Sequence, residues 1–527
     1  MPRCSGMVFV VAATLAVLAE ASPPVKPFES DAESVAKCRI DELVCSRLKT
    51  LDIVPARVCS DEVFLRRAYL DVIGTLPTVE EAKEFLRDTN PEKRSQLVDR
   101  LLEREEYVDY WTMKWCDLLR VKSEFPINLW PNAVQAYHRW IRTCIKENMP
   151  YDRFVREMLT ASGSNFRRPQ VNFYRAIQSK EPMTTAQAVA LSFLGVRPGT
   201  WSQEQWSGMA AFFSQIAYKP TGEWKEEIVL FDLDKAATEA GVQALQMAAY
   251  PDGTKATLSP GQDPREAFAE WLLAPRNPWF GRAIANRVWF WLLGRGIIDP
   301  PDDIRPDNPP SNPELLAFLE EELVTHQYDL KHLYRLILNS ATYQCSHIST
   351  TSDDRGEMNF ACYSLRRLEA EVLIDALCQI SGTTEQYSSI IPEPYTFMPE
   401  NQRSMMLADA SITSPFLEKY GRSSRDSGME SDRSSRPTPA QRLHMLNSSH
   451  IRRKLESGPK LQPLLRTSGR DNHAEAVTEL YLTILSRFPT EEELEIMETY
   501  FRSGGRSTAL RDLAWALINC PEFSYRH

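Results

Sequence analysis

The sequence has little of what several common functional sites require. Only 21 of its 527 residues are glycine, against 35 prolines, and no glycine-rich loop of the kind that cradles a phosphate occurs. The Gly-x-Ser-x-Gly pattern of a hydrolase nucleophile is also missing. Lysine and arginine total 61 against 71 acidic residues, which gives a net charge of −10, and basic residues form no concentrated tract. This acidic balance argues against a nucleic-acid partner.

Cysteine is sparse, and its spacing suits neither a disulfide framework nor a thiolate metal site. Of ten cysteines, Cys4 lies in the expected signal peptide, and the odd number that is left requires at least one unpaired thiol per chain. Cys38 and Cys45 share one predicted helix, and ~10 Å along its axis separates them, too far for a mutual bond. No Cys-x-x-Cys pair occurs, and the spacing assigns no bridge among the other cysteines.

Long apolar runs are absent after the first residues. Residues 6–18 (GMVFVVAATLAVL) follow a single positive charge, Arg3, and small residues then precede Ser22. This order is typical of a secretory signal peptide, and the run falls short of the ~20 apolar residues of a membrane-spanning helix, which leaves an anchor as the weaker alternative. We predict a signal peptide over 1–21, no membrane span after its cleavage, and an exported protein that is periplasmic or extracellular.

Apolar residues recur at helical spacing along most of the chain. Residues 61–74 and 93–120 carry this period, the latter as one long or kinked helix, and Thr78 with Glu81 forms a capping box at the start of another. A strand-like pattern occurs only near 217–258. The fold class we predict is mainly α, a multi-helical protein with a possible small β element near 217–258, to which we expect strand to be confined.

Two parts of the chain repeat one pattern. YLDVIGTLPTVEE at Tyr69 matches YLTILSRFPTEEE at Tyr481, and each copy predicts a helix that ends before Pro-Thr, followed by a capped second helix. Helices that close with LLEREEY, LINCPEF and ILNSATY follow at 101–107, 517–523 and 337–343. These helical-hairpin repeats indicate architecture rather than chemistry. By contrast, residues 421–439 are rich in Ser, Arg and Asp without apolar period, which predicts an exposed or locally disordered loop.

A family resemblance rests on four long stretches among others: FLRRAYLDVIGTLPTVEEAKEFL (64–86), DPREAFAEWLLAPRNPWFGRAIANRVWFWLLGRGIIDPPDD (263–303), YDLKHLYRLILNSATYQ (328–344) and ELYLTILSRFPTEEEL (479–494). On these residues the chain resembles the planctomycete-type bacterial secreted cytochrome-like proteins, which join an N-terminal cytochrome-like domain to a C-terminal companion domain of unknown function. The resemblance implies a helical cytochrome-like domain over 22–215, a linker or small β element over 216–262 and the companion domain over 263–527. It also implies secreted sulfatase-like or polysaccharide-processing proteins as partners.

One segment that the resemblance implies is missing. In this family a Cys-x-x-Cys-His segment, suited to covalent haem, stands between helices that end in FLGV and begin with AAFF. Here both helices are kept, but the residues between them, 197–208, contain neither Cys nor His. We therefore expect no haem and no other cofactor, and we expect Trp201 and Trp206 to fill the vacated space with apolar area.

The resemblance implies a second pair of cysteines, and this pair is also missing. Family members carry Cys-x-Cys after a Gly-Arg turn, whereas this chain has Met429 and Ser431 there. His347 and Cys345 form the nearest Cys–His pair, and one such pair is too little to define a metal site. We therefore predict no metal site.

Charged residues are the remaining candidates for a site. The Pro-stiffened loop 299–307 holds four acids that could bind Ca²⁺, supply an acid and a base for glycoside hydrolysis, or simply pair with nearby arginines. Arg367, Glu371 and Asp375 recur at i, i+4 and i+8, which is typical of a salt-bridged seam on one helix face. The binding candidates are Arg282, Asn286, Arg287, Asp299, Asp302, Asp303, Arg305 and Arg367, and the sequence assigns no catalytic residue.

Two functions from different classes remain. The first is an exported non-haem helical binding or scaffold protein that acts with secreted polysaccharide- or sulfate-processing enzymes. The alternative is a hydrolase of glycans or their esters that uses the acids of 299–307, and the sequence leaves open whether the protein is an enzyme. Acids paired with arginine at a domain seam favour binding, whereas two carboxylates ~5–10 Å apart in one open cleft favour hydrolysis.

Overall fold

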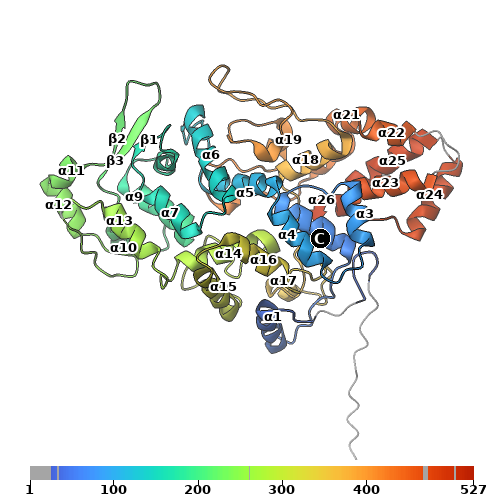
Figure 1. Ribbon diagram of the computed structural model, residues 1–527, viewed down its shortest axis with the longest axis horizontal. Helices are drawn as coiled ribbons and strands as arrows, with labels where there is room; N and C mark the ends of the chain where they lie inside the picture. Colours follow the sequence, from blue (N-terminus) through green and yellow to red (C-terminus); the bar gives the residue numbers. More distant parts are fainter. Residues whose placement is uncertain (1–24, 32–34, 260, 467–472, 504–505) are drawn as a thin grey trace, which may run out of the picture.

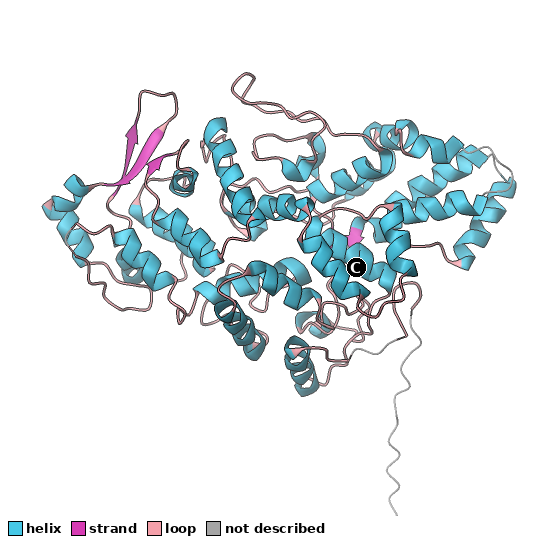
Figure 2. Ribbon diagram, in the orientation of Figure 1, coloured by secondary structure: helices cyan, strands magenta, loops and turns pink. Residues whose placement is uncertain are grey.

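The computed structural model describes residues 25–31, 35–259, 261–466, 473–503 and 506–527, so the expected signal peptide over 1–21 lies outside the described residues. The fold is mainly helical, as the periodicity predicts (Figures 1 and 2). Up to the small sheet, the α-helices are α1 (Arg39–Thr50), α2 (Asp61–Ala68), α3 (Val79–Arg87), α4 (Lys93–Leu102), α5 (Glu105–Leu118), α6 (Pro131–Lys146), α7 (Tyr151–Leu159), α8 (Asn172–Arg175), α9 (Pro182–Val189) and α10 (Gln203–Ala211). The stretch 93–120, expected as one long or kinked helix, is divided into α4 and α5.

The later α-helices run from the sheet to the last residues. They are α11 (Leu233–Ala237), α12 (Glu239–Gln246), α13 (Pro264–Leu272), α14 (Phe280–Leu293), α15 (Pro313–Thr325), α16 (Leu330–Leu338), α17 (Arg355–Met358), α18 (Ala370–Ser381), α19 (Pro415–Lys419), α20 (Pro439–Asn447), α21 (Ser449–Ser457), α22 (Leu461–Arg466), α23 (His473–Leu485), α24 (Glu491–Ser503), α25 (Arg506–Asn519) and α26 (Pro521–Ser524). Among the described residues, no helix combines the length and the hydropathy needed to cross a membrane. No disulfide joins the cysteines within the same residues.

Short π- and 3₁₀-helical segments complete the helical structure. The π-helical segments η1 (Tyr69–Ile73) and η3 (Ala190–Leu194) directly continue α2 and α9. Both end at a glycine in the left-handed region, Gly74 at φ 60° and Gly195 at φ 67°, a conformation that glycine adopts without strain. The 3₁₀ segments are η2 (Pro169–Val171), η4 (Ser404–Met406) and η5 (Glu430–Asp432).

Strands are few and short. The hairpin of β2 (Ile216–Pro220) and β3 (Glu227–Phe231) confirms the small β element, and β1 (Gly163–Ser164) adds to it in the antiparallel order β1-β3-β2. The expectation that strand is confined to 217–258 is wrong, because β1 and the pair β4 (Arg366–Arg367) and β5 (Tyr525–Arg526) lie outside that range. A two-residue strand is too short for an alternating pattern, so local residue patterns do not predict these strands.

The two copies of the sequence repeat build matching helix pairs. In the first, Thr78 accepts a hydrogen bond from the N–H of Glu81, and in the second Thr490 accepts one from Glu493 at 3.2 Å. In each copy a residue in the left-handed region follows the first helix, Gly74 at φ 60° and Ser486 at φ 61°. Each repeat is therefore a helical hairpin with the same turn and the same capping box.

Both hairpins also hold an arginine between two glutamates. Arg104 lies 2.7 Å from Glu81 and 2.6 Å from Glu106, while Arg487 lies 2.7 Å from each of Glu493 and Glu522. Glu81 and Glu493 occupy the same position of the repeat. The arginines do not, because Arg104 directly precedes α5 whereas Arg487 belongs to the turn before α24. The same ion-pair arrangement is therefore built from different chain positions.

The two halves of the chain share one interior. A single cluster of buried apolar side chains runs from Ile40 in α1 to Phe523 in α26. The buried guanidinium of Arg66 donates to the carbonyl oxygens of Ile484 and Phe523, both at 2.9 Å. Because Arg66 satisfies carbonyls at helix ends more than 400 residues away, the first helices and the last helices fold against one another. Figure 1 accordingly places the C-terminal end in the middle of the molecule beside α26.

The segment 421–439 is not the exposed loop that its composition predicts. Arg425 is buried and the side chain of Arg433 is 9% exposed; they lie 2.9 and 2.7 Å from the carboxylate of Asp117 on α5, and Arg433 also binds Glu371. Burial removes the arginines from water, which costs free energy, and these ion pairs compensate for that cost. Within the segment, Ser424, Ser431 and the end, 434–439, are exposed.

The expected seam of Arg367, Glu371 and Asp375 is likewise wrong. Glu371 pairs with Arg433, and Asp375 accepts hydrogen bonds from the N–H groups of Ser404 at 2.7 Å and Met405 at 3.1 Å. Arg367 lies before α18 in the short strand β4. The helix begins only at Ala370, so Arg367 does not share a helix face with Glu371 and Asp375.

Candidate functional site

The acidic loop 299–307 docks on the break between the helices that end at Leu194 and begin at Gln203. The N–H of Ile304 donates to the carbonyl oxygen of Gly195 at 2.8 Å, and Arg197 donates to the carboxylate of the buried Asp302 at 2.5 Å. A Cβ atom on Gly195 would lie 2.9 Å from the side chain of Ile304. The break is therefore the surface that receives the loop.

Asn286 and Arg287 hold this junction from α14, and both are fully buried. The Asn286 amide exchanges two hydrogen bonds of 2.8 Å with the backbone of Ile298, which fixes the start of the loop. Arg287 donates to the carbonyl oxygens of Ser192 at 2.9 Å and Leu191 at 3.3 Å, near the end of η3. These residues satisfy backbone groups that have no helical partner.

The other charged candidates are paired locally. Asp299 lies 3.5 Å from Arg295, and Arg305 lies 3.4 Å from Asp303 and 3.3 Å from Asp307. Arg282, one helical turn before Asn286, pairs with Glu320 at 2.8 Å. Each acid of the loop therefore has an arginine partner.

Aromatic rings pack the helix break. Trp206 is 3% exposed, its ring centroid lies 4.8 Å from that of Trp201, and Trp201 lies 5.9 Å from Trp279. Ser202, which follows Trp201 in the chain, caps α10 by accepting a hydrogen bond from the N–H of Gln205. The junction is therefore closed by apolar area, and within the described residues it holds no cysteine or histidine.

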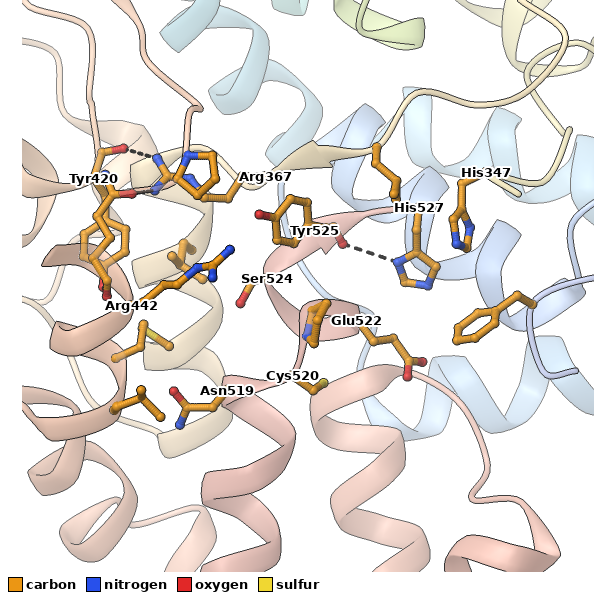
Figure 3. A pocket seen from close by; sticks show the side chains of 18 residues that line it. His347, Arg367, Tyr420, Arg442, Asn519, Cys520, Glu522, Ser524, Tyr525 and His527 are labelled. Carbon is orange, nitrogen blue, oxygen red and sulfur yellow. Dashed lines mark hydrogen bonds between the residues drawn. The ribbon is translucent and has the colours of Figure 1, made fainter. Parts of the chain in front are cut away.

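A different region of the molecule contains an open cavity of about 520 Å³ (Figure 3). Helix α20, the C-terminal end of α25 with α26 and β5, and Phe28 near the start of the described chain supply its walls. Arg367 alone of the sequence candidates lines it. The volume falls in the range of pockets that take small organic molecules.

Arg367 builds one wall of the cavity. Its guanidinium donates to the carbonyl oxygens of Tyr420 at 2.6 Å and Ser434 at 3.1 Å, and to the side-chain oxygen of Gln441. The same Gln441 oxygen accepts from the N–H of Thr438 at 2.9 Å in the capping box of α20. Arg367 therefore positions α20 and the chain after α19, and both of its terminal nitrogens are occupied.

The opposite wall is aromatic. The rings of Phe28, His347 and His527 meet edge to face, with centroids 5.6–5.8 Å apart. Burial, reinforced by nearby arginine, lowers the pKa of His347 to about 4, and it lowers the pKa of His527 well below its usual value. Both imidazoles are therefore neutral at pH 7 and add no charge to this wall.

Unpaired polar groups gather between the two walls. Figure 3 shows Arg442 extending from α20 toward Ser524 and Tyr525. The guanidinium of Arg442 and the hydroxyls of Ser524 and Tyr525 make no hydrogen bond or ion pair with any described part of the chain. Glu522, the acid that lines the cavity, is bound by Arg487 at 2.7 Å. The cavity thus combines apolar walls with one free cation and two free hydroxyls.

Sequence patterns did not identify these residues. Arg442, Ser524 and Tyr525 lie in ordinary helical and terminal stretches, and 81 intervening positions separate Arg442 from Ser524. The one lining residue among the sequence-based binding candidates is Arg367, a candidate because of its spacing to Glu371 and Asp375. Its terminal nitrogens bind Tyr420, Ser434 and Gln441, so Arg367 supports the wall of the cavity.

Comparison with known proteins finds two regions of the chain that match family models. Residues 39–218 match the family model described as PSCyt2, a protein of unknown function (DUF1549), and residues 264–501 match that described as PSD1, a protein of unknown function (DUF1553). No curated protein and no solved structure matches the chain. The cavity of Figure 3 draws on the second matched region and on residues outside both, namely Phe28 and 519–527. Both matched models describe proteins of unknown function, and their order along the chain is consistent with a two-domain family.

Proposed function

We propose that this protein is an exported, non-haem binding protein, and that the cavity of Figure 3 binds an apolar molecule or protein segment with one anionic group. The observation that carries the proposal is the free guanidinium of Arg442 beside two free hydroxyls in a largely apolar cavity. An apolar ligand body gains free energy when it leaves water, and a charged group fixes its orientation.

The charge of the cavity favours an anion. His347 and His527 are neutral at pH 7, and the negative charge of Glu522 is compensated by Arg487. Among the described residues neither lining arginine, Arg367 nor Arg442, has an acid in ion-pair distance, and Arg442 is the one whose guanidinium is not already occupied by hydrogen bonds. A carboxylate or sulfate can accept two parallel hydrogen bonds from its planar guanidinium, a geometry that a neutral ligand does not match.

The wider biological setting of the proposal comes from the family resemblance. We propose periplasmic or extracellular localisation and partners among secreted sulfatase-like or polysaccharide-processing proteins. A ligand with a sulfate or carboxylate group is compatible with such partners. The cytochrome-like ancestry and the loss of its haem segment between Val196 and Met209 are part of the same proposal.

The arrangement of the acids favours binding over the alternative, a glycan or ester hydrolase that uses loop 299–307. Asp302 is 1% exposed and pairs with Arg197, and the other acids pair with Arg295 and Arg305. A glycosidase needs two carboxylates that face a substrate cleft. If Asp302→Asn or Asp303→Asn abolished a hydrolytic activity of the purified protein without unfolding it, the hydrolase would replace the binding protein as the better proposal.

Two fluorescent probes of similar size test the ligand class. 8-Anilinonaphthalene-1-sulfonate carries a negative charge, whereas N-phenyl-1-naphthylamine is neutral. We expect Arg442→Gln to weaken sulfonate binding about tenfold, the effect of losing one charge-assisted hydrogen bond of ~1.5 kcal/mol, and to leave the neutral probe within about twofold. Ser524→Phe fills the cavity and should weaken both probes.

Arg156→Gln is the matched control, because Arg156 is an exposed arginine on α7 whose side chain forms no ion pair among the described residues. Equal losses in Arg156→Gln and Arg442→Gln, or no loss in Arg442→Gln, would contradict the proposal. For the partner, the wild-type protein and Ser524→Phe serve as baits in the native extract. Recovery of only cytosolic proteins by both would contradict the proposed setting.

A further inference from the structure

Three metal-binding side chains meet at the turn between α15 and α16. One carboxylate oxygen of Glu322 lies 2.9 Å from Nε2 of His332 and 3.4 Å from Nδ1 of His326. The three ligand atoms all lie within 4.8 Å of one another. This cluster lines neither the cavity of Figure 3 nor the junction at Arg197.

The backbone of the turn holds the two imidazoles face to face. His326 is the C-cap of α15, and the next two residues, Gln327 at φ 53° and Tyr328 at φ 59°, reverse the chain in left-handed conformations. Asp329 then caps α16 by accepting from the N–H of His332 at 3.1 Å. As a result the rings of His326 and His332 are stacked, with centroids 3.6 Å apart.

The cluster differs from an ordinary ion pair between histidine and glutamate. The chain contains such a pair in Glu385 and His450, which lie 3.0 Å apart, and there Lys454 lies 3.3 Å from the same carboxylate oxygen. Around Glu322, by contrast, the described residues place two imidazoles and no lysine or arginine in ion-pair distance. Glu322 therefore lacks the cation that neutralises Glu385.

We propose that Glu322, His326 and His332 bind one divalent transition-metal ion of the Zn²⁺ class. In a tetrahedral zinc site, metal–ligand distances of about 2.0–2.1 Å place neighbouring ligand atoms about 3.3 Å apart. The observed separations of 2.9 and 3.4 Å from the carboxylate bracket that value. Two imidazoles and one carboxylate suit zinc and similar ions better than Ca²⁺ or Mg²⁺, which prefer oxygen ligands.

Binding requires one ring to move. A metal ion lies in the plane of each imidazole that binds it, so the two rings cannot remain stacked. His326 is the more exposed of the two, at 42% of its side-chain area against 27% for His332. Its ring turns out of the stack and gives up the 3.0 Å contact of Nδ1 with the Glu322 carbonyl oxygen. The ion then joins α15 to α16, and its remaining coordination position is open to water.

The site departs from the sequence-based expectation of no metal. Its ligands follow Glu-x₃-His-x₅-His, and the first two sit one helical turn apart, but the third depends on the reversal at 327–328. The expectation was drawn from thiol spacing and from pairs of cysteine and histidine. This cluster contains no cysteine, so that expectation did not cover it.

Titration of the metal-free full-length protein with Co²⁺, followed through its visible d–d bands and by calorimetry, tests the proposal. We expect one Co²⁺ per chain, displaced by Zn²⁺. His332→Ala and Glu322→Gln should each weaken binding at least tenfold, and His326→Ala, at the most exposed ligand, should do the same without loss of helical circular dichroism. His450→Ala, in the other Glu–His pair, should bind as the wild type does.

Three results would overturn the proposal. The first is the absence of stoichiometric Co²⁺ or Zn²⁺ binding by the wild type. The second is undiminished binding by folded His332→Ala and Glu322→Gln. The third is an equal loss in His450→Ala, which would indicate weak and unspecific binding to histidine rather than a built site.

Discussion

Arg197 and Asp302 lie 2.5 Å apart although 105 positions separate them in the chain. Arg197 stands in the break between two helices, and Asp302 stands in the acidic loop that docks on the break. Asp302 is almost fully buried, and its second carboxylate oxygen has no hydrogen-bond partner among the described residues. The pair is therefore a joint between two segments that the sequence alone marks as unrelated.

Removal of Arg197 should destabilise the fold, because it leaves a buried carboxylate without its counter-ion. We expect Arg197→Met to lower the free energy of unfolding by about 3 kcal/mol, and the double variant Arg197→Met/Asp302→Leu to recover most of that loss. Urea unfolding followed by circular dichroism measures both. Strictly additive losses in the double variant would show that the two side chains do not interact energetically.

The two tryptophans at the helix break should behave as core residues. Trp201→Ala combined with Trp206→Ala should cost several kcal/mol of unfolding free energy, as the removal of large buried side chains does. Trp224 is 69% exposed, so Trp224→Ala serves as the control and should change stability by about 0.5 kcal/mol or less. Equal effects at the two places would mean that the indoles do not fill the break.

Purified protein should show no Soret absorbance, either as isolated or after reduction with dithionite. A c-type haem needs two thiols in local register with an imidazole, and residues 197–208 offer none of these. Pyridine haemochrome spectra and iron analysis measure the content directly. One iron per chain would refute the proposed loss of the haem segment, whereas zinc bound at Glu322 would not bear on it.

His347 should make the fold sensitive to acid. Burial lowers its pKa to about 4 in the folded protein, below the ordinary value of 6.5, so the unfolded chain binds more protons between these values. Its contribution to stability is therefore present above pH 6.5 and is lost as the pH falls from 6.5 to 4. His347→Phe should show a shallower loss over this interval.

Urea unfolding of the wild type and His347→Phe at several pH values between 8 and 4 provides the comparison. At pH 8 the imidazole is neutral in both the folded and the unfolded chain, so any difference there reports only the change in packing. If the two proteins lost stability in parallel between pH 6.5 and 4, the titration of His347 would not contribute.

Helical elements and their caps could be predicted from local sequence. The capping box of Thr78 and Glu81 forms as expected, and the hairpin around Thr490 repeats it. Such features depend on residues three or four positions apart, so the pattern contains the information that the structure uses. The β2–β3 hairpin followed for the same reason, since its strands are close in sequence.

The prediction from composition was wrong where ion pairs between distant segments decide which side chains are buried. Residues 421–439 have the polarity of a surface loop, yet Arg425 and Arg433 lie inside the protein because Asp117 and Glu371 meet them there. A charged side chain can be buried when a partner of opposite charge meets it there. Arg425 and its partner Asp117 are 308 positions apart in the chain. No window along the sequence contains both.

The sequence by itself determined the helical class, the repeated hairpins and the lack of a Cys-x-x-Cys pair, because each depends on residue type and local spacing. Tertiary structure alone decided which charged residues remain free. It paired the acids of 299–307 with arginines, used Arg367 as a wall support, and left Arg442 unpaired beside Ser524 and Tyr525. The physical reason is that charge compensation requires proximity in space, and the folded chain brings together α20, α26 and β5 from positions far apart in sequence.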